Sequence, residues 1–150
     1  MAHFRPFKAY RPKAEDIRRI AEKSSDYSSK KELVQAIESN KLSYLNLTNA
    51  HRLDKCEGIP EKAFAHAQEY IERMFNGGHL TEDDSDCLYV YRQTSLQRSC
   101  TGIIGKADIE EYDNNVIKKH ELTRTNSEHL IADLFRSTRV LGEPVLLGHT

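Results

Sequence analysis

The segment from residue 60 to residue 78 places the strongest limit on how this chain can fold. Pro60 suits the first turn of a helix, because that position needs no backbone N–H donor. Apolar residues then recur at helical spacing: Ala63, Phe64, Ala67, Tyr70, Ile71, Met74 and Phe75. Gly77 and Gly78 follow them and predict the end of the helix. An amphipathic helix must bury one face, so its aromatic side chains are predicted to lie in a core rather than to bind a cofactor.

Three further helices are expected, two before this one in the sequence and one after it. Apolar residues at helical spacing predict them from Lys13 to Lys23, from Lys30 to Ser39 and from Ser127 to Ser137. Ser28 or Ser29 can cap the second of these, because a serine hydroxyl accepts a hydrogen bond from a free backbone N–H in the first turn.

Strands are expected between and after these helices. Alternating or β-branched residues predict them at Leu42–Thr48, Cys87–Thr94, Thr101–Ile109 and Pro144–Leu147. Cys87–Thr94 carries apolar groups on both faces, so we expect it to lie centrally in a sheet, with Thr101–Ile109 as its hairpin partner. The polar stretch Asn49–Gly58 is predicted to be a loop.

These elements predict an α+β fold with a small mixed β-sheet flanked by helices. The first twelve residues are expected to be extended, because two prolines forbid a helix there. The chain has 150 residues, of which 38% are hydrophobic and 30% are charged. We therefore expect one modest core, with residues 1–150 forming a single domain.

The overall charge limits the classes of partner. The formal net charge is −1 and the pI is about 6.7, whereas domains that bind nucleic acid usually have a pI above about 9. Since no helix-turn-helix pattern is present either, nucleic acid is not expected as a partner. No apolar run approaches the roughly 18 residues of a membrane span, so no membrane contact is expected.

The cysteines and most histidines predict no metal site. Cys56, Cys87 and Cys100 are widely spaced, and they form neither a disulfide framework nor a Cys-x-x-Cys pair. Cys87 and Cys100 fall in strand-like sequence and are predicted to be buried thiols, which fits a cytoplasmic protein. Six histidines lack metal-ligand spacing and are predicted to lie at the surface or at helix ends: His3, His51, His66, His79, His129 and His149.

The segment from Tyr112 to Arg124 holds the strongest candidate for chemistry. His120 and Glu121 are adjacent acid-base groups, and Lys118 and Lys119 precede them. Such a set suits a site that handles an anion or a proton. It is also typical of a polar helix start on a solvated surface, or of a local ion pair. Composition alone favours this second interpretation.

Four segments carry a resemblance to a known family. They are Pro6–Pro12, Cys87–Thr94, Asn115–Arg124 and Gly142–Leu147. In this order and spacing the chain resembles the N-terminal part of a widespread bacterial family of unknown function, domain-of-unknown-function family ten-fifteen. Its members are often labelled ParB-like, so the resemblance implies a ParB/sulfiredoxin-like fold.

The chain departs from the family pattern at several points, among them the three that follow. The later Asp-Gly-His-His-Arg motif of the family is absent, and Ser24 and Ser25 stand where Asp26 is usually preceded by Pro-Tyr. Asn115 stands where the family usually has a glycine. We expect either a truncated, diverged member or one whose partner chain or homodimer supplies the missing motif.

The resemblance implies a nucleotide-dependent phosphotransferase, a kinase that acts on a small hydroxyl compound such as serine and uses ATP or ADP with Mg²⁺. His120 or Glu121 would be the base, and Asp26 the base or a metal carboxylate. The implied binding residues for substrate or phosphate are Arg11, Lys118, Lys119, Thr123 and Arg124. Two alternatives stay open: a non-catalytic regulatory or interaction protein that keeps the fold without the phosphate motif, and a DNA-binding module.

Overall fold

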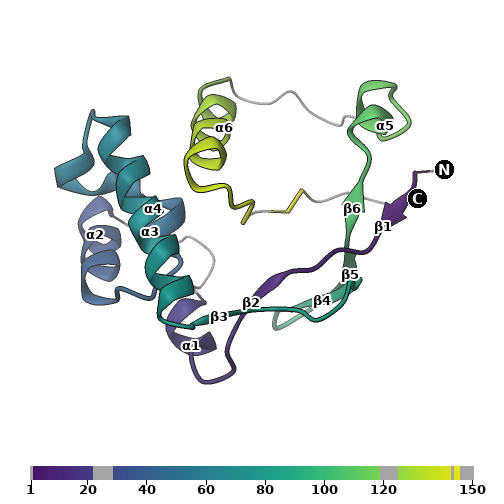
Figure 1. Ribbon diagram of the computed structural model, residues 1–150, viewed down its shortest axis with the longest axis horizontal. Coiled ribbons are helices and arrows are strands. Elements are labelled where there is room, and N and C mark those ends of the chain that lie inside the picture. The colour runs from purple at the N-terminus through teal and green to yellow at the C-terminus, as the bar shows by residue number, and fades with distance from the viewer. Residues whose placement is uncertain (1, 22–28, 119–124, 143, 146–150) are drawn as a thin grey trace. The chain divides into compact units, whose positions relative to one another are not determined.

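The computed structural model describes residues 2–21, 29–118, 125–142 and 144–145. Helices and short strands both occur, which confirms the α+β class (Figure 1). Among the described residues, no helix combines the length and the apolar composition that a membrane crossing requires.

The chain divides into two compact units. Unit 1 consists of Met1–Tyr10, Glu82–Arg124 and Gly142–Thr150, and unit 2 consists of Arg11–Thr81 and Thr125–Leu141. The chain therefore passes out of unit 2 after residue 81 and returns to it at residue 125.

Unit 2 is helical. Its helices and 3₁₀ turns are α1 (Ile17–Ile20), α2 (Lys30–Ser39), α3 (Leu45–Thr48), the 3₁₀ turns η1 (Ala50–Arg52) and η2 (Asp54–Cys56), α4 (Pro60–Asn76) and α6 (Thr125–Thr138). Figure 1 shows α4 as the longest of these helices, and both α3 and α6 pack against it. The helices predicted at residues 30–39, 60–76 and 127–137 are confirmed, with α6 starting two residues earlier than expected.

The ends of α4 are set by the residues that predicted them. Pro60 occupies the first turn. At the other end Gly78 has φ of +64°, a left-handed conformation that costs glycine little. The N–H of Gly78 donates to the Phe75 carbonyl at 2.9 Å, and the N–H of His79 donates to the Met74 carbonyl at 3.0 Å. These two bonds form a Schellman motif, which satisfies carbonyls at the helix end.

The apolar core of unit 2 falls into two clusters, both of which use α4. The first cluster contains Ile20, Leu42, Leu47, Ala67, Tyr70, Ile71 and Met74. The second contains Leu33, Ile37, Leu45, Ala50, Leu53, Cys56 and Ala63. The apolar face of α4 therefore supplies much of the core, and the predicted core position is confirmed for Tyr70, which is 1% exposed. It is wrong for Phe75, which is 38% exposed, and Phe64 is half-buried.

The predicted strand at Leu42–Thr48 is wrong, because α3 lies there. Its polar residues decide the conformation. The Ser43 hydroxyl accepts a hydrogen bond from the Leu45 N–H at 3.2 Å, and the Asn46 amide donates to the carbonyls of Asn40 and Ser43 at 3.0 and 2.9 Å. Such local side-chain bonds compete with a strand ladder and favour a turn or a helix start.

The loop predicted at Asn49–Gly58 also belongs to the core. Within η1 and η2, or between them, Ala50, Leu53 and Cys56 are at most 3% exposed. Their spacing of three residues is the period of a 3₁₀ helix, which places all three on one side. The loop was predicted because the residues between these three are polar.

The first two helices differ in outcome. At α2 the Ser29 hydroxyl accepts a hydrogen bond from the Glu32 N–H at 3.2 Å, which confirms a serine cap. The helix predicted from residue 13 to residue 23 is only α1 in the described part of the chain. α1 ends at Ile20, since Ala21 is extended with ψ of 131°. Ile17, which the predicted apolar stripe places in the core, is 47% exposed.

The described strands form three two-stranded sheets rather than one mixed sheet. β1 (Phe4–Arg5) pairs with β6 (Lys106–Ala107), β2 (Tyr10–Pro12) with β3 (Leu80–Glu82), and β4 (Tyr89–Thr94) with β5 (Ser99–Ile104). The β4–β5 hairpin confirms the predicted pairing, with Val90 opposite Ile103. Within the described residues β4 pairs with β5 only, so the expectation of a central strand is wrong. Of the strand predicted at Pro144–Leu147, residues 146 and 147 lie outside the described part, and Pro144 and Val145 are in no strand.

Unit 1 contains no buried residue among those that the structure describes, since every buried side chain belongs to unit 2. Val90 and Ile103 are 74% and 61% exposed. Cys87 is half-buried and Cys100 is exposed, so the prediction that both thiols are buried is wrong. Val90 and Ile103 are therefore largely uncovered, whereas Tyr89 of β4 packs against Phe7, with ring centroids 5.1 Å apart.

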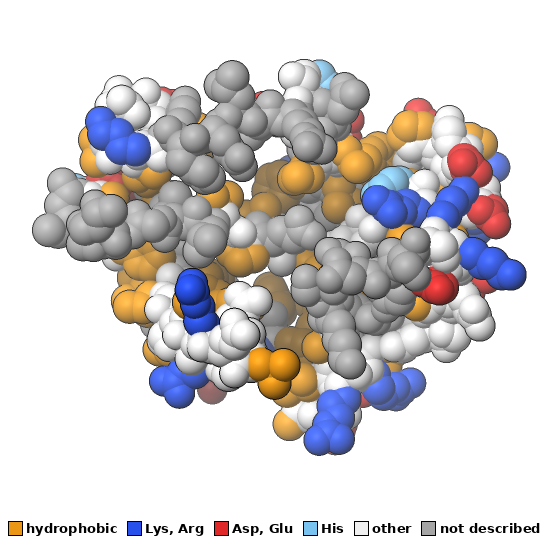
Figure 2. Space-filling view, turned by 180° about the vertical axis from the view of Figure 1, so that it is seen from behind, with side chains coloured by type: hydrophobic (Ala, Val, Ile, Leu, Met, Phe, Trp, Pro, Cys, Tyr) orange, Lys and Arg blue, Asp and Glu red, His pale blue; other side chains and the backbone are white. Residues whose placement is uncertain are grey.

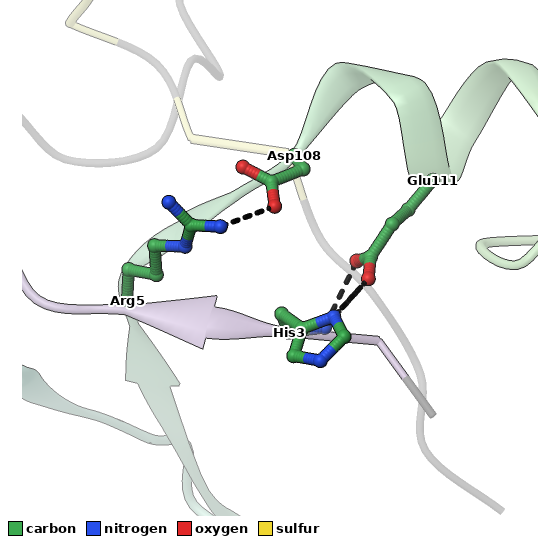
Figure 3. A network of polar contacts seen from close by, with 4 residues as sticks. All are labelled: His3, Arg5, Asp108 and Glu111. Atoms are coloured by element: carbon green, nitrogen blue, oxygen red, sulfur yellow. Dashed lines mark hydrogen bonds and ion pairs between the residues drawn. The ribbon is translucent and has the colours of Figure 1, made fainter.

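Polar contacts tie the start of unit 1 to α5 (Ile109–Asp113), as Figure 3 shows. The backbone N–H of His3 donates to Glu111 Oε2 at 2.9 Å, and the His3 ring meets Glu111 Oε1 at 2.5 Å. Arg5 donates to Asp108 at 2.8 Å. The hydrogen bonds from His3 hold the pKa of Glu111 below its usual value of 4.5. These contacts join β1 and the residue before it to α5 and the residue before that helix.

Gly105 is needed where β1 passes close to the backbone before β6. A Cβ atom at this position would lie 2.5 Å from the Phe4 ring and 2.9 Å from the Arg5 carbonyl oxygen. Gly105→Ala is therefore expected to lower the free energy of unfolding of unit 1 by about 1–3 kcal/mol, because the strand pair must shift. Urea unfolding followed by circular dichroism measures the change.

Gly102→Ala is the matched control, since a Cβ atom there meets nothing within 4 Å. Its effect is expected to stay within about 0.5 kcal/mol. Equal effects of the two alanines would contradict the close approach at Gly105.

Candidate functional site

Most of the predicted site residues lie outside the described part of the chain. This holds for Asp26, Lys119, His120, Glu121, Thr123 and Arg124. Their proposed roles stay predictions. Two predicted residues are described: Arg11 is exposed on β2 in unit 2, and Lys118 is exposed after α5 in unit 1.

Within unit 2 a carboxylate and an imidazole form a close pair. Asp16 Oδ2 and His79 Nδ1 are 2.7 Å apart, although the two residues are 63 positions apart in the sequence. Asp16 is 7% exposed, and the His79 side chain is 26% exposed. The carboxylate is thus almost enclosed, while the imidazole reaches the surface.

Local structure places each partner. Asp16 is the residue before α1, and its N–H donates to the Lys13 carbonyl at 2.9 Å in the turn that follows β2. His79 follows the Schellman motif of α4, and its carbonyl accepts a hydrogen bond from the Lys13 N–H at 3.0 Å. A Cβ atom on Gly77 would lie 2.8 Å from His79 Nε2, so the glycine leaves room for the ring.

Cationic side chains surround this pair. Arg19 NH1 is 3.8 Å from Asp16 Oδ1. The Lys13 ammonium would lie 3.4 Å from a Cβ atom on Gly78, the neighbour of His79. Arg11 belongs to β2, which pairs with β3, and β3 begins directly after His79. Arg19 and Lys13 thus lie close to the pair, and Arg11 belongs to the strand beside the one that follows His79.

The pair has the arrangement of a general base. A carboxylate that accepts from Nδ1–H fixes the tautomer of a histidine and leaves a lone pair on Nε2. It also stabilises the imidazolium that forms when Nε2 takes a proton. The same contact holds α1 to the end of α4, so it has a structural effect as well.

The sequence interpretation missed both partners. His79 was expected to be a histidine at the surface or at a helix end; it does follow α4, but its ring is bonded to a carboxylate. Asp16 was assigned to the interior of a predicted helix and given no role. The available signal was the Gly-Gly-His sequence, because a Schellman motif fixes the direction of the residue after the glycines.

The donor set fits a phosphate group better than it fits Mg²⁺. Arginine and lysine side chains suit phosphate oxygens. Magnesium needs oxygen ligands, and both oxygens of Asp16 already face cationic or N–H groups. The described residues include no group of three or more His, Cys, Asp or Glu side chains that could hold a metal ion. The contacts of its two oxygens make Asp16 a poor ligand for magnesium.

Comparison with known proteins identifies the family. Comparisons with curated proteins and with solved structures gave no match. The model of the family described as "Protein of unknown function (DUF1015)" matches residues 4–150. Because this match spans nearly the whole sequence, the chain belongs to the DUF1015 family.

Proposed function

We propose that this chain is a nucleotide-dependent phosphotransferase that acts on a small hydroxyl compound such as serine. The observation that carries the proposal is the Asp16–His79 pair, whose Oδ2 and Nδ1 atoms lie 2.7 Å apart among cationic side chains. The ParB/sulfiredoxin-like resemblance of the sequence supports a nucleotide as the phosphoryl donor.

In this proposal His79 is the base. Its Nε2 takes the proton of the substrate hydroxyl while the hydroxyl oxygen bonds to the terminal phosphorus of the nucleotide. The bond from that phosphorus to the bridging oxygen breaks, and its electron pair leaves with the nucleotide. Asp16 acts as a positioning residue that holds the ring, and Arg11 meets phosphate oxygens with its planar fork.

The first test is a thermal-shift titration of the full chain with ATP and ADP, with and without Mg²⁺ and L-serine. A ligand at 100 times its dissociation constant adds about 2.7 kcal/mol of stability, which raises the melting temperature measurably. A saturable shift is expected in the wild type and a much weaker one in Arg11→Ala. Arg18→Ala is the matched control, because Arg18 is an exposed arginine of α1, and its shift should equal that of the wild type.

The second test separates chemistry from binding. His79→Gln is expected to lower phosphoryl transfer to serine by about 100-fold or more while the nucleotide-dependent shift remains. Asp16→Asn should lower transfer while the nucleotide-dependent shift remains, since the side chain no longer fixes the tautomer of the His79 ring. Transfer that survives in His79→Gln would overturn the assignment of the base, and the absence of any nucleotide shift would overturn the function.

An interaction protein without catalytic activity is the second candidate. The β4–β5 hairpin favours it, because the cross-strand pair of Val90 and Ile103 is exposed and apolar. Figure 2 shows that hydrophobic side chains reach the surface on the face in view. Exposed apolar patches often mark sites of protein–protein contact. If the chain binds no nucleotide, these exposed apolar residues make an interaction protein the better interpretation.

A further inference from the structure

A pocket of about 340 Å³ lies between η2 and α4 in unit 2, and neither Asp16 nor His79 lines it. It is lined by Lys55, Cys56, Lys62, Ala65, His66 and Glu69. Its volume is at the small end of the range for pockets that bind small molecules. The size alone limits an occupant to a small organic compound.

The pocket has a buried part and an exposed part. Cys56 is 3% exposed and His66 is 9% exposed. Lys55, Lys62 and Glu69 are exposed. The buried part offers a thiol and an imidazole, and the exposed part carries two positive charges and one negative charge.

The His66 ring is held in one orientation. Its Nε2 lies 3.1 Å from Asn46 Oδ1, and the Asn46 amide nitrogen already donates to two backbone carbonyls. The oxygen of Asn46 is thus an acceptor, so the hydrogen of the neutral ring is on Nε2. His66 Nδ1 is buried and has no hydrogen-bond partner in the described structure.

The electrostatic field at His66 is positive. Burial lowers the pKa of His66 below 6.5, and Lys55, Arg73 and Lys41 lower it further. Of the charged groups that act on the ring, Glu69 alone raises its pKa. The imidazole is therefore neutral at pH 7.5, and Lys55 is the pocket lysine whose charge acts on it.

We infer that this pocket binds a small organic acid, with the oxyanion between Lys55 and Lys62 and the apolar part against Ala65 and Cys56. An ammonium or guanidinium group is not favoured there, because the lysines outnumber Glu69. The negative charge of a bound acid offsets the field of the lysines, so binding also makes protonation of His66 easier. This site is independent of the Asp16–His79 pair and of the proposed phosphotransferase activity.

The test is an NMR titration of the full chain at pH 7.5 with benzoate, and with benzamide as its uncharged counterpart of similar shape. Benzoate is expected to shift the ring signal of His66 in a saturable way and to bind at least tenfold more tightly than benzamide. A pH titration at saturating benzoate is expected to give a higher pKa for His66 than one without it. Equal affinities for the two compounds would overturn the inference.

Lysine variants localise the binding. The double variant Lys55→Gln, Lys62→Gln is expected to weaken benzoate binding at least tenfold. Both side chains are exposed, so the fold should be kept, which circular dichroism checks. Lys31→Gln is the matched control at an exposed position of α2, and its affinity should stay within twofold of the wild type. Unchanged binding in the double variant would place the acid elsewhere and contradict the inference.

Discussion

Leu53→Ala is expected to lower the free energy of unfolding of unit 2 by about 2–5 kcal/mol, the range for removing a large aliphatic side chain from a core. Leu53 is 1% exposed and belongs to the cluster that contains Leu33, Ile37 and Leu45. The alanine leaves a cavity that the surrounding helices fill only in part. Urea unfolding followed by circular dichroism at 222 nm measures the loss.

Leu96→Ala is the control for this experiment. Leu96 lies in the turn between β4 and β5 and is fully exposed, so its replacement should change stability by less than about 0.5 kcal/mol. A small effect at Leu53, similar to that at Leu96, would contradict the core position of Leu53. It would support the surface loop that the polar composition of residues 49–58 predicts.

Asn46→Ala is expected to cost about 3 kcal/mol, because it removes three buried hydrogen bonds at once. The Asn46 amide donates to the carbonyls of Asn40 and Ser43, and its oxygen faces His66 Nε2 at 3.1 Å. Each buried group that loses its partner costs about 1–3 kcal/mol, and these losses are not fully additive. Thermal and urea unfolding should agree on the size of the effect.

Asn49→Ala tests whether the cost belongs to the position or to the residue type. Asn49 follows α3 and is half-buried, and its side-chain amide donates to the Thr48 hydroxyl at 2.8 Å. Its replacement should cost about 1 kcal/mol or less. An equal cost at the two asparagines would contradict the role of Asn46 as the centre of a buried network.

Sequence reasoning succeeded where one local signal was enough. α4 has a proline at its start, a helical apolar period and two glycines at its end, and these three signals agree. The predictions for residues 42–58 were wrong because the fold of this segment depends on contacts that the sequence does not show. Ser43 and Asn46 look like surface residues until their bonds to neighbouring carbonyls are known.

The candidate site was predictable only in part for the same reason. The resemblance directed attention to Arg11, which the structure places on the strand that leads towards Asp16. The contact between Asp16 and His79 joins two elements that are distant in the sequence, so no spacing rule could pair them. At Asn115, by contrast, the substitution can be understood from a single residue. Its φ of +59° is a left-handed conformation that asparagine tolerates, so it can replace the glycine that the family usually has there.

The order of the core residues along the chain has a consequence for synthesis on the ribosome. Every buried apolar side chain of the described residues comes from the first 74 positions. α6 and the residues directly after it add only partly buried ones, such as Leu134 in α6 and Val140 beyond its end. Nascent chains emerge N-terminus first, and compact units fold as they appear. The helical core can thus condense before α6 has emerged, and α6 then docks against α4 on a surface that is already formed.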